Sequence, residues 1–215
     1  MDCKNIKSYI FDLDGVICFT DKYHYLAWKQ VADEQGIYFD EEINNRLRGV
    51  SRMASLEIIL ERSDKLYTMS EKVAMAEKKN HIYREYLKQM SPEDLSSEVK
   101  STLEELKYKG CKLAIGSSSK NTRFILERIG LVDFFDAIVD GTMIAHSKPN
   151  PEVFLKAAEL MEADPSSCIV VEDAKAGIQA AKAGGFISFA LYGDARECGL
   201  EDCNLDSFEN LLKFV

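Results

Sequence analysis

Two pairs of acidic residues stand where short apolar runs end, and these residue types could together hold a metal ion. The pairs are Asp12 with Asp14, and Glu172 with Asp173. Carboxylates that meet without a cation are electrostatically costly, and oxygen ligands with room for water favour Mg²⁺. Each pair also has a purely structural interpretation: an acidic turn for the first, and for Asp173 the cap of a following helix.

A lysine and a run of hydroxyl groups are candidates for binding an anion. Lys148 precedes a proline that restrains its loop, although a lone lysine is usually a solvated side chain. Hydroxyls and free backbone N–H groups ahead of a predicted helix form an anion site, although serine-rich turns are common. The residues of this run are Ser117, Ser118, Ser119 and Asn121.

Strands that alternate with helices must position these residues. Short apolar runs occupy 6–11, 111–115, 137–139, 168–171 and 186–191, and helical patterns occupy 99–109, 121–129, 151–161 and 174–183. This alternation predicts βαβ units in an α/β, doubly wound, parallel-sheet (Rossmann-like) core with both faces covered. Because parallel strands present their carboxyl ends at one edge, where ligands bind, we expect the four carboxylates and Lys148 to converge there.

The segment 16–90 differs from the remainder because it contains no proline and shows helical periodicity. We expect three or four helices between about residues 21 and 90, with breaks at Gly36 and Gly49. This inserted segment begins directly after the first predicted strand, at the sheet edge where the carboxylates are expected. The sequence therefore predicts an inserted α-helical cap (16–90) on a core formed by 1–15 and 91–215.

The predicted cap has two further candidate groups. Thr20, His24 and Trp28 recur every four residues and share one helix face, which has the alternative interpretation of a buried aromatic face. The second group is the turn Arg48, Gly49, Val50, Ser51 and Arg52, followed by Ser55. Ser51 is the predicted N-cap of the next helix. Arg52 then falls in the first turn, where a bound anion would offset the unfavourable macrodipole; the alternative is an exposed arginine.

Composition excludes several classes of function. The 215 residues include 36 Asp or Glu and 27 Lys or Arg, a formal net charge of −9, which argues against a general binder of nucleic acids or anionic membranes. An anionic small substrate stays open, because a metal or a few cations reverse the local field. With no long apolar run, no signal-peptide pattern and no Cys-x-x-Cys, we expect a soluble cytoplasmic protein with reduced cysteines.

In their residue types and order, four motifs resemble those of the haloacid dehalogenase-like superfamily: Asp12-x-Asp14, Ser117, Lys148 and Glu172-Asp173. The resemblance implies phosphoryl transfer, because the superfamily's dehalogenases lack the second aspartate. It implies that Asp12 is the nucleophile and Asp14 the general acid and base. It also implies that Mg²⁺ is held by the carboxylates of Asp12 and Asp173 and the backbone carbonyl of Asp14, with Glu172 nearby. Ser117 and Lys148 would bind the transferring phosphoryl group.

The cap motifs and the serine run resemble the β-phosphoglucomutase group of that superfamily. The match implies that Arg52, Ser119 and Asn121 hold the non-transferring phosphate, and that His24, Trp28 and residues 49–51 contact the sugar. Thr20, Ser55 and Ser118 complete the predicted substrate-binding set. Lys79, followed by Asn80, resembles a cap lysine of the group, although a basic helix face is the alternative interpretation. Arg48 stands where the group has lysine. Charge is conserved at that position, but guanidinium geometry differs from that of an ammonium.

The activity that this resemblance implies is interconversion of β-D-glucose 1-phosphate and D-glucose 6-phosphate. It would proceed through an aspartyl phosphate at Asp12 and β-glucose 1,6-bisphosphate, with Mg²⁺ and catalytic amounts of a sugar bisphosphate as primer. We expect small sugar phosphates as partners, no nucleic acid or membrane, and a monomer. Two alternatives are a Mg²⁺-dependent sugar-phosphate phosphatase, which needs only the proximal phosphate site and admits water, and a non-catalytic phosphosugar-binding module.

Overall fold

The computed structural model describes residues 6–47 and 50–215, and the chain divides into two compact units. One unit comprises 1–19 and 91–215, and the other comprises 20–90. Residues 16–19 belong to the first unit, whereas the sequence predicted a division after residue 15. A turn explains the difference, because the N–H groups of Ile17 and Cys18 both donate to the Leu13 carbonyl, at 3.0 and 3.1 Å.

The first unit is built on a parallel six-stranded sheet in the order β3-β2-β1-β4-β5-β6. The strands are β1 (Ser8–Phe11), β2 (Lys112–Gly116), β3 (Ala137–Val139), β4 (Cys168–Glu172), β5 (Ile187–Ala190) and β6 (Cys203–Asn204). The predicted α/β class is confirmed, and the first five strands lie within two residues of their predicted bounds. The sequence did not predict β6, which has two residues and no apolar run.

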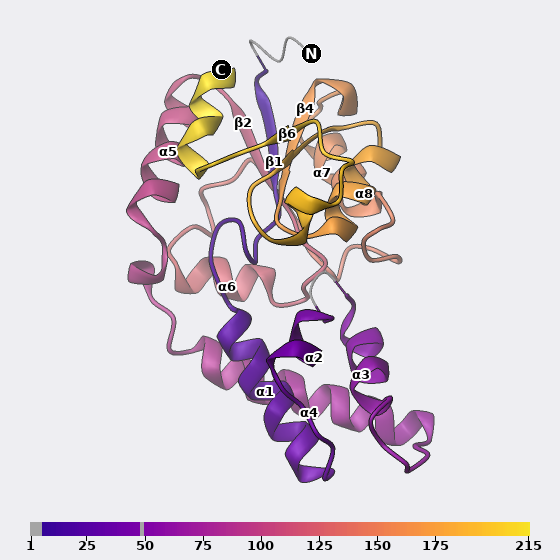
Figure 1. Ribbon diagram of the computed structural model, residues 1–215. Coiled ribbons are helices and arrows are strands. Elements are labelled where there is room, and N and C mark those ends of the chain that lie inside the picture. Colours follow the sequence, from indigo (N-terminus) through magenta and orange to yellow (C-terminus); the bar gives the residue numbers. More distant parts are fainter. Residues whose placement is uncertain (1–5, 48–49) are drawn as a thin grey trace. The chain divides into compact units, whose positions relative to one another are not determined.

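Both faces of the sheet are covered, as predicted. The helices are α5 (Ser97–Tyr108), α6 (Thr122–Arg128), α7 (Glu152–Leu160) and α8 (Lys175–Ala183), with 3₁₀ turns η1 (Pro92–Asp94), η2 (Pro165–Ser167), η3 (Gly193–Glu197) and η4 (Phe208–Phe214). Figure 1 shows α5 and η4 on one side of the sheet and α7 and α8 on the other. Successive side chains of β1 point to opposite faces of the sheet, so the strand contributes to the packing on both. Ile10 packs in the cluster with Phe154 of α7, whereas the Phe11 ring lies 5.5 Å from that of Phe208.

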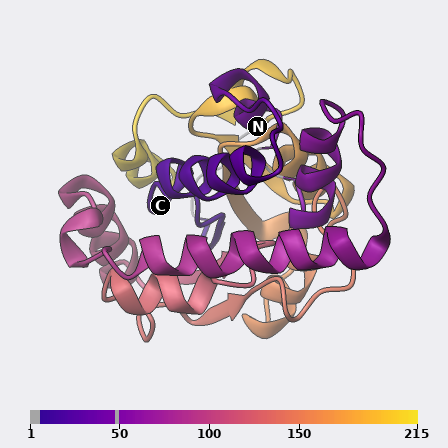
Figure 2. The ribbon, with the colours of Figure 1, turned by 90° about the horizontal axis from the view of Figure 1, so that it is seen from below.

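The second unit is helical, with α1 (Asp21–Glu34), α2 (Glu41–Asn45), α3 (Arg52–Leu60) and α4 (Met69–Leu87). Helix α1 packs along α4, and Figure 2 shows the two side by side. Ser51 caps α3, as predicted, by accepting a hydrogen bond from the N–H of Ala54 at 3.3 Å. The apolar core of this unit includes Trp28, Leu56 and Ile59. Among the described residues, no helix combines the length and the apolar character needed to cross a membrane.

Candidate active site

Three carboxylates gather where β1 and β4 end. Each of Asp12, Glu172 and Asp173 offers a carboxylate oxygen, and these oxygens all lie within 4.8 Å of one another. The register of the sheet causes this approach, because Phe11 is paired with Val171, and Asp12 and Glu172 are the next residues along the two chains. The N–H of Asp12 donates to the Val171 carbonyl at 3.0 Å. Two acidic strand ends are thus fixed side by side, as parallel topology predicts.

Gly15 allows the turn after Asp14 to approach the end of β4. Its φ of +90° lies in the left-handed region, which favours glycine. A Cβ at this position would lie 2.1 Å from Oδ2 of Asp173. The turn is closed by the Gly15 N–H, which donates to the Cys18 carbonyl at 2.8 Å. Glycine is therefore required both by the backbone conformation and by the adjacent carboxylate.

Lys148 joins two of the carboxylates. Its buried ammonium forms ion pairs with Asp12 and, at 2.5 Å, with Oε1 of Glu172. The ammonium also lies 4.6 Å from the centre of the Phe154 ring. Burial alone would lower the pKa of Lys148, but the charges of Asp12 and Glu172 outweigh burial and raise it above its ordinary value. Lys148 therefore remains a cation at the acidic edge of the sheet.

Both carboxylate oxygens of Glu172 have partners. Oε1 accepts from Lys148, and Oε2 accepts from the N–H groups of Asp173 and Ala174 at 3.0 and 3.1 Å. The carboxylate has room because Gly177 lies against it, where a Cβ would be 1.9 Å from Oε1. Asp173 does not cap α8: the N-cap residue is Ala174, and the N–H of Lys175, the first residue of the helix, donates to Oδ1 of Asp194 at 2.7 Å. The interpretation of Asp173 as a helix cap is therefore wrong.

The acidic cluster has the electrostatics of a cation site. Burial, followed by the charges of Glu172, Asp12 and Asp14, raises the pKa of Asp173 to about 9. A carboxyl group that retains its proton so far above its ordinary pKa lies in a strongly negative field. The donors are all oxygens, which suits Mg²⁺. The residues present therefore fit the divalent cation that the sequence predicted.

Two backbone amides in the serine loop between β2 and α6 already have partners. The Ser117 hydroxyl accepts from the N–H of Ser119, and the Ser119 hydroxyl accepts from the N–H of Asn121, both at 3.2 Å. The prediction that these backbone groups are free for an anion is therefore wrong for these two amides. The loop also approaches the lysine loop, because the N–H of Lys148 donates to the Ser118 hydroxyl at 3.5 Å. Ser117 and Asn121 are buried.

In the helical unit, the face formed by Thr20, His24 and Trp28 meets α4. The Thr20 hydroxyl lies 2.8 Å from that of Tyr83, and both Thr20 and Trp28 are buried. The Lys79 ammonium lies 5.1 Å from the centre of the Trp28 ring. These contacts agree with the buried aromatic face that was the alternative interpretation. Sugar contact by these three residues stays a prediction.

His24, which is half-buried, pairs with the buried Lys79, a contact that the four-residue spacing alone could not predict. Burial, and then the charges of Lys79 and Arg52, hold the pKa of His24 well below its usual range. His24 is therefore neutral, and its Nδ1 accepts a hydrogen bond from the Lys79 ammonium at 2.7 Å. Lys79 occupies the buried face of α4 between Ala76 and Tyr83. The resemblance had already singled out Lys79, although the predicted substrate-binding set omitted it; a lysine at an apolar position of a helix is a second signal in the sequence that supports adding it.

The α3 turn is described from Val50 onward, so the predictions for Arg48 and Gly49 lie outside the described residues. Arg52 begins α3 as predicted, and its guanidinium donates to Oδ1 of Asn80 at 2.8 Å. Val50 is exposed, whereas Ser55 is buried among the residues of α3. Phosphate or sugar contact by this turn stays a prediction.

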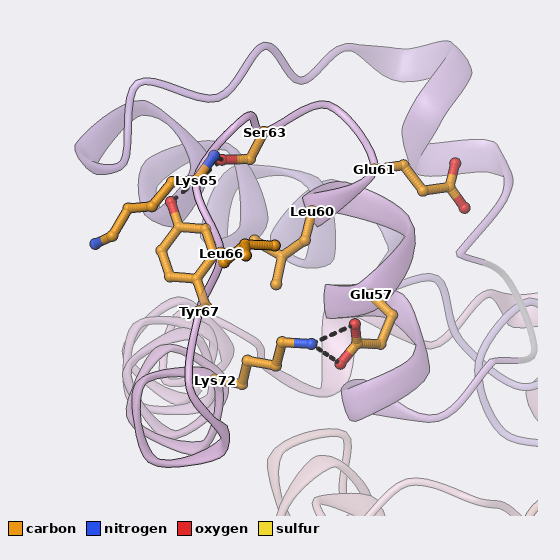
Figure 3. A pocket seen from close by; sticks show the side chains of 8 residues that line it. All are labelled: Glu57, Leu60, Glu61, Ser63, Lys65, Leu66, Tyr67 and Lys72. Carbon is orange, nitrogen blue, oxygen red and sulfur yellow. Dashed lines mark hydrogen bonds and ion pairs between the residues drawn. The ribbon is translucent and has the colours of Figure 1, made fainter.

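A surface hollow of the helical unit lies beside the α3–α4 connection (Figure 3). Its lining comprises Glu57, Leu60, Glu61, Ser63, Lys65, Leu66, Tyr67 and Lys72. The Lys72 ammonium donates to both carboxylate oxygens of Glu57, at 2.8 and 2.7 Å (Figure 3). The charge of Lys72 is thus neutralised by Glu57. No residue of the acidic cluster lines the hollow. We assign the hollow no catalytic role.

Comparisons with known proteins agree with this fold and site. The family described as haloacid dehalogenase-like hydrolase matches residues 9–191, and the chain belongs to this family. The β-phosphoglucomutase of Bacillus subtilis is 43% identical over 188 residues, covering 86% of this chain and 83% of that protein. A phosphorylated carbohydrates phosphatase of Thermotoga maritima is 31% identical over 185 residues, covering 84% of this chain and 82% of that protein. The crystal structure of a β-phosphoglucomutase from Clostridium difficile matches with a TM-score of 0.88 and 38% identity, over 96% of this chain and 93% of that one.

Proposed function

We propose that this chain interconverts β-D-glucose 1-phosphate and D-glucose 6-phosphate by phosphoryl transfer through Asp12. The observation that carries the proposal is the pairing of Asp12 with Lys148 inside the acidic cluster. It is supported by 43% identity to the B. subtilis relative, whose name states this activity. The same identity favours a mutase over a phosphatase or a non-catalytic binding module.

Asp12 acts as the nucleophile in this proposal. Its carboxylate attacks phosphorus and forms an aspartyl phosphate, while the buried Lys148 ammonium reduces repulsion between the two anions. Ser117 contributes its hydroxyl to the binding of the transferring group. Mg²⁺ would be held by the carboxylates of Asp12 and Asp173 and the backbone carbonyl of Asp14, with Glu172 adjacent, and would supply neutralisation of the phosphoryl charge.

Asp14 moves protons in the two half-reactions. When phosphorylated Asp12 donates its phosphoryl group to the sugar 6-hydroxyl, Asp14 accepts the hydroxyl proton. The product is β-glucose 1,6-bisphosphate. In the second half-reaction Asp12 accepts the 1-phosphoryl group, and Asp14 returns the proton to the leaving oxygen. A trace of sugar bisphosphate starts the cycle by phosphorylating Asp12.

A mutase must also hold the phosphate that is not being transferred. We assign this role in the helical unit to Arg52, which the hydrogen bond to Asn80 holds at the start of α3. An anion at this position interacts favourably with both the guanidinium and the positive end of the helix dipole. A phosphatase has no need of such a second phosphate contact.

Hydrolysis of a sugar phosphate is the second candidate function. Relatives at 31% and 34% identity are described as a phosphorylated carbohydrates phosphatase and a fructose-1-phosphate phosphatase. Both reactions share the Asp12 chemistry and differ in the acceptor, which is a sugar hydroxyl in one and water in the other.

One assay separates the two candidates. The protein is incubated with Mg²⁺, β-glucose 1-phosphate and a trace of glucose 1,6-bisphosphate, and glucose 6-phosphate and free phosphate are measured together. We expect glucose 6-phosphate without matching release of phosphate. Stoichiometric phosphate with no glucose 6-phosphate would overturn the proposal in favour of the phosphatase, and neither product would indicate a binding module.

A further inference from the structure

The loop that carries Lys148 is tied to helix α7 by one carboxylate outside the acidic cluster. Glu152 is the first residue of α7, and its side chain reaches back along the loop. It accepts hydrogen bonds from the N–H of Ala145, at 3.1 Å to each oxygen, and from the N–H of His146 at 2.9 Å. Two consecutive backbone groups shortly before Lys148 are therefore fixed by a charged acceptor.

Lys156, one turn further along α7, extends this contact. Its ammonium lies 2.8 Å from Oε1 of Glu152 and donates to the carbonyl of Met143 at 2.5 Å. Hydrogen bonds to Lys156 and then to the N–H groups of Ala145 and His146 lower the pKa of Glu152 to about 2. The acceptor consequently remains charged throughout the neutral range.

Beyond these contacts, the N–H of Asn150 donates to the Ser147 carbonyl at 3.1 Å and closes a turn that contains Lys148. The N–H of Lys148 donates to the Ser118 hydroxyl at 3.5 Å, a long hydrogen bond. A lysine side chain is a flexible chain of four carbons that ends in the ammonium group. The position that the ammonium can reach therefore depends on the position of the Lys148 backbone. In this structure that ammonium must reach Asp12 and Glu172 together.

We propose that Glu152 is a positioning residue for Lys148: it holds the backbone of residues 145–146 so that the ammonium meets both carboxylates of the cluster. The proposal rests on the proposed role of Lys148 in binding the transferring phosphoryl group. Glu152 itself contacts no reacting atom. Its effect is transmitted through Ser147, the one residue that separates His146 from Lys148.

The first test needs no substrate. We compare Glu152→Gln with Glu159→Gln, a matched change on the same helix, where the side chain is exposed and forms no ion pair with any described residue. Hydrogen exchange at the amides of 145 and 146 should become about tenfold faster or more in Glu152→Gln only, as expected for the loss of a charge-assisted hydrogen bond. Unchanged exchange at these amides would overturn the proposal.

The second test asks whether the effect passes through Lys148. Affinity for beryllium fluoride in the presence of Mg²⁺ is measured in the wild type, Glu152→Gln, Lys148→Met and the double variant, with denaturant unfolding as a check that each is folded. Glu152→Gln should weaken binding about 10-fold to about 100-fold, the scale expected when a binding group is misplaced by about 1 Å. In the Lys148→Met background it should add little.

Equal weakening in both backgrounds would show a general structural effect and overturn the proposal. Neither measurement uses a glucose phosphate. If the mutase assay fails while these two results hold, the proposed function falls and the positioning role stands. If glucose 6-phosphate forms at the wild-type rate in Glu152→Gln, the positioning role falls and the proposed function stands.

Discussion

Replacing Gly15 by alanine should weaken Mg²⁺ binding beyond any effect on backbone conformation. The new Cβ would lie 2.1 Å from Oδ2 of Asp173, so the carboxylate must move about 1.3 Å to reach the 3.4 Å of ordinary contact. Mg²⁺ demands near-ideal octahedral geometry with ligands at about 2.0–2.1 Å, and does not follow such a shift. Loss or misplacement of this carboxylate should reduce affinity by about 10-fold to about 100-fold or more, judging from changes that disturb the orientation of metal ligands.

The matched control is Gly185→Ala in the same unit. Gly185 has a φ of +79°, close to the +90° of Gly15, but a Cβ there meets nothing within 4 Å. Both variants should lose about 1–2 kcal/mol of unfolding free energy, because alanine disfavours the left-handed region. Calorimetric titration with Mg²⁺ should then show weaker binding in Gly15→Ala alone. Equal affinity in the two variants would refute the assignment of Asp173 as a metal ligand.

Three further predictions concern the charged residues. Asp12→Asn should abolish formation of glucose 6-phosphate, since an amide cannot form the aspartyl phosphate; measurable turnover in the coupled assay would contradict the covalent scheme. Without Mg²⁺, the pKa of Asp173 is about 9 in the folded protein and 3.8 in the unfolded chain, so between these pH values the folded state binds the proton and the unfolded state does not. Stability of the metal-free protein should therefore fall as pH rises between these values, and Asp173→Asn should remove that contribution in denaturant titrations followed at several pH values. Arg52→Ala should lower mutase turnover more than the rate at which the aspartyl enzyme loses phosphate; an equal decrease in both rates would identify Arg52 as structural.

The order of strands and helices was predictable because each buried strand is a short apolar run bounded by polar loops. Parallel strands also place their carboxyl ends at one edge, so the approach of Asp12 to Glu172 and Asp173 followed from topology. β6 was not predictable, because Cys203 and Asn204 carry no apolar pattern. These two residues form a strand only because β5 offers an edge in register with them.

The loops show where sequence spacing stops being informative. A run of serines ahead of a helix indicates available N–H groups, but the hydroxyls of Ser117 and Ser119 themselves bind two of these groups. Whether a hydroxyl turns back to its own loop depends on backbone dihedral angles, which residue types do not specify. The contact between the Glu152 carboxylate and the N–H groups of Ala145 and His146 likewise depends on the backbone dihedral angles of the loop, which the residue types do not specify.

The helical unit shows the same limit for packing. A four-residue spacing correctly indicated that Thr20, His24 and Trp28 share a face, yet it could not identify the element that covers that face. The partner of His24 is Lys79, 55 residues later in the chain. Nothing in the local pattern around His24 specifies a lysine as its neighbour. The lowered pKa of the imidazole therefore depends on tertiary contact.

Three glycines show how the fold sustains a cluster of like charges. A Cβ on Gly15 or Gly193 would lie 2.1 Å from Oδ2 or 2.3 Å from the carbonyl oxygen of Asp173, and one on Gly177 would lie 1.9 Å from Oε1 of Glu172. The three glycines belong to the turn after β1, to η3 and to α8, so backbone approaches the acidic pair from three segments. Backbone at these three places leaves the two carboxylates little space in which to move apart. Their repulsion must be relieved by a proton or a cation, so the demand for a cation originates in the packing of the backbone as much as in the charges.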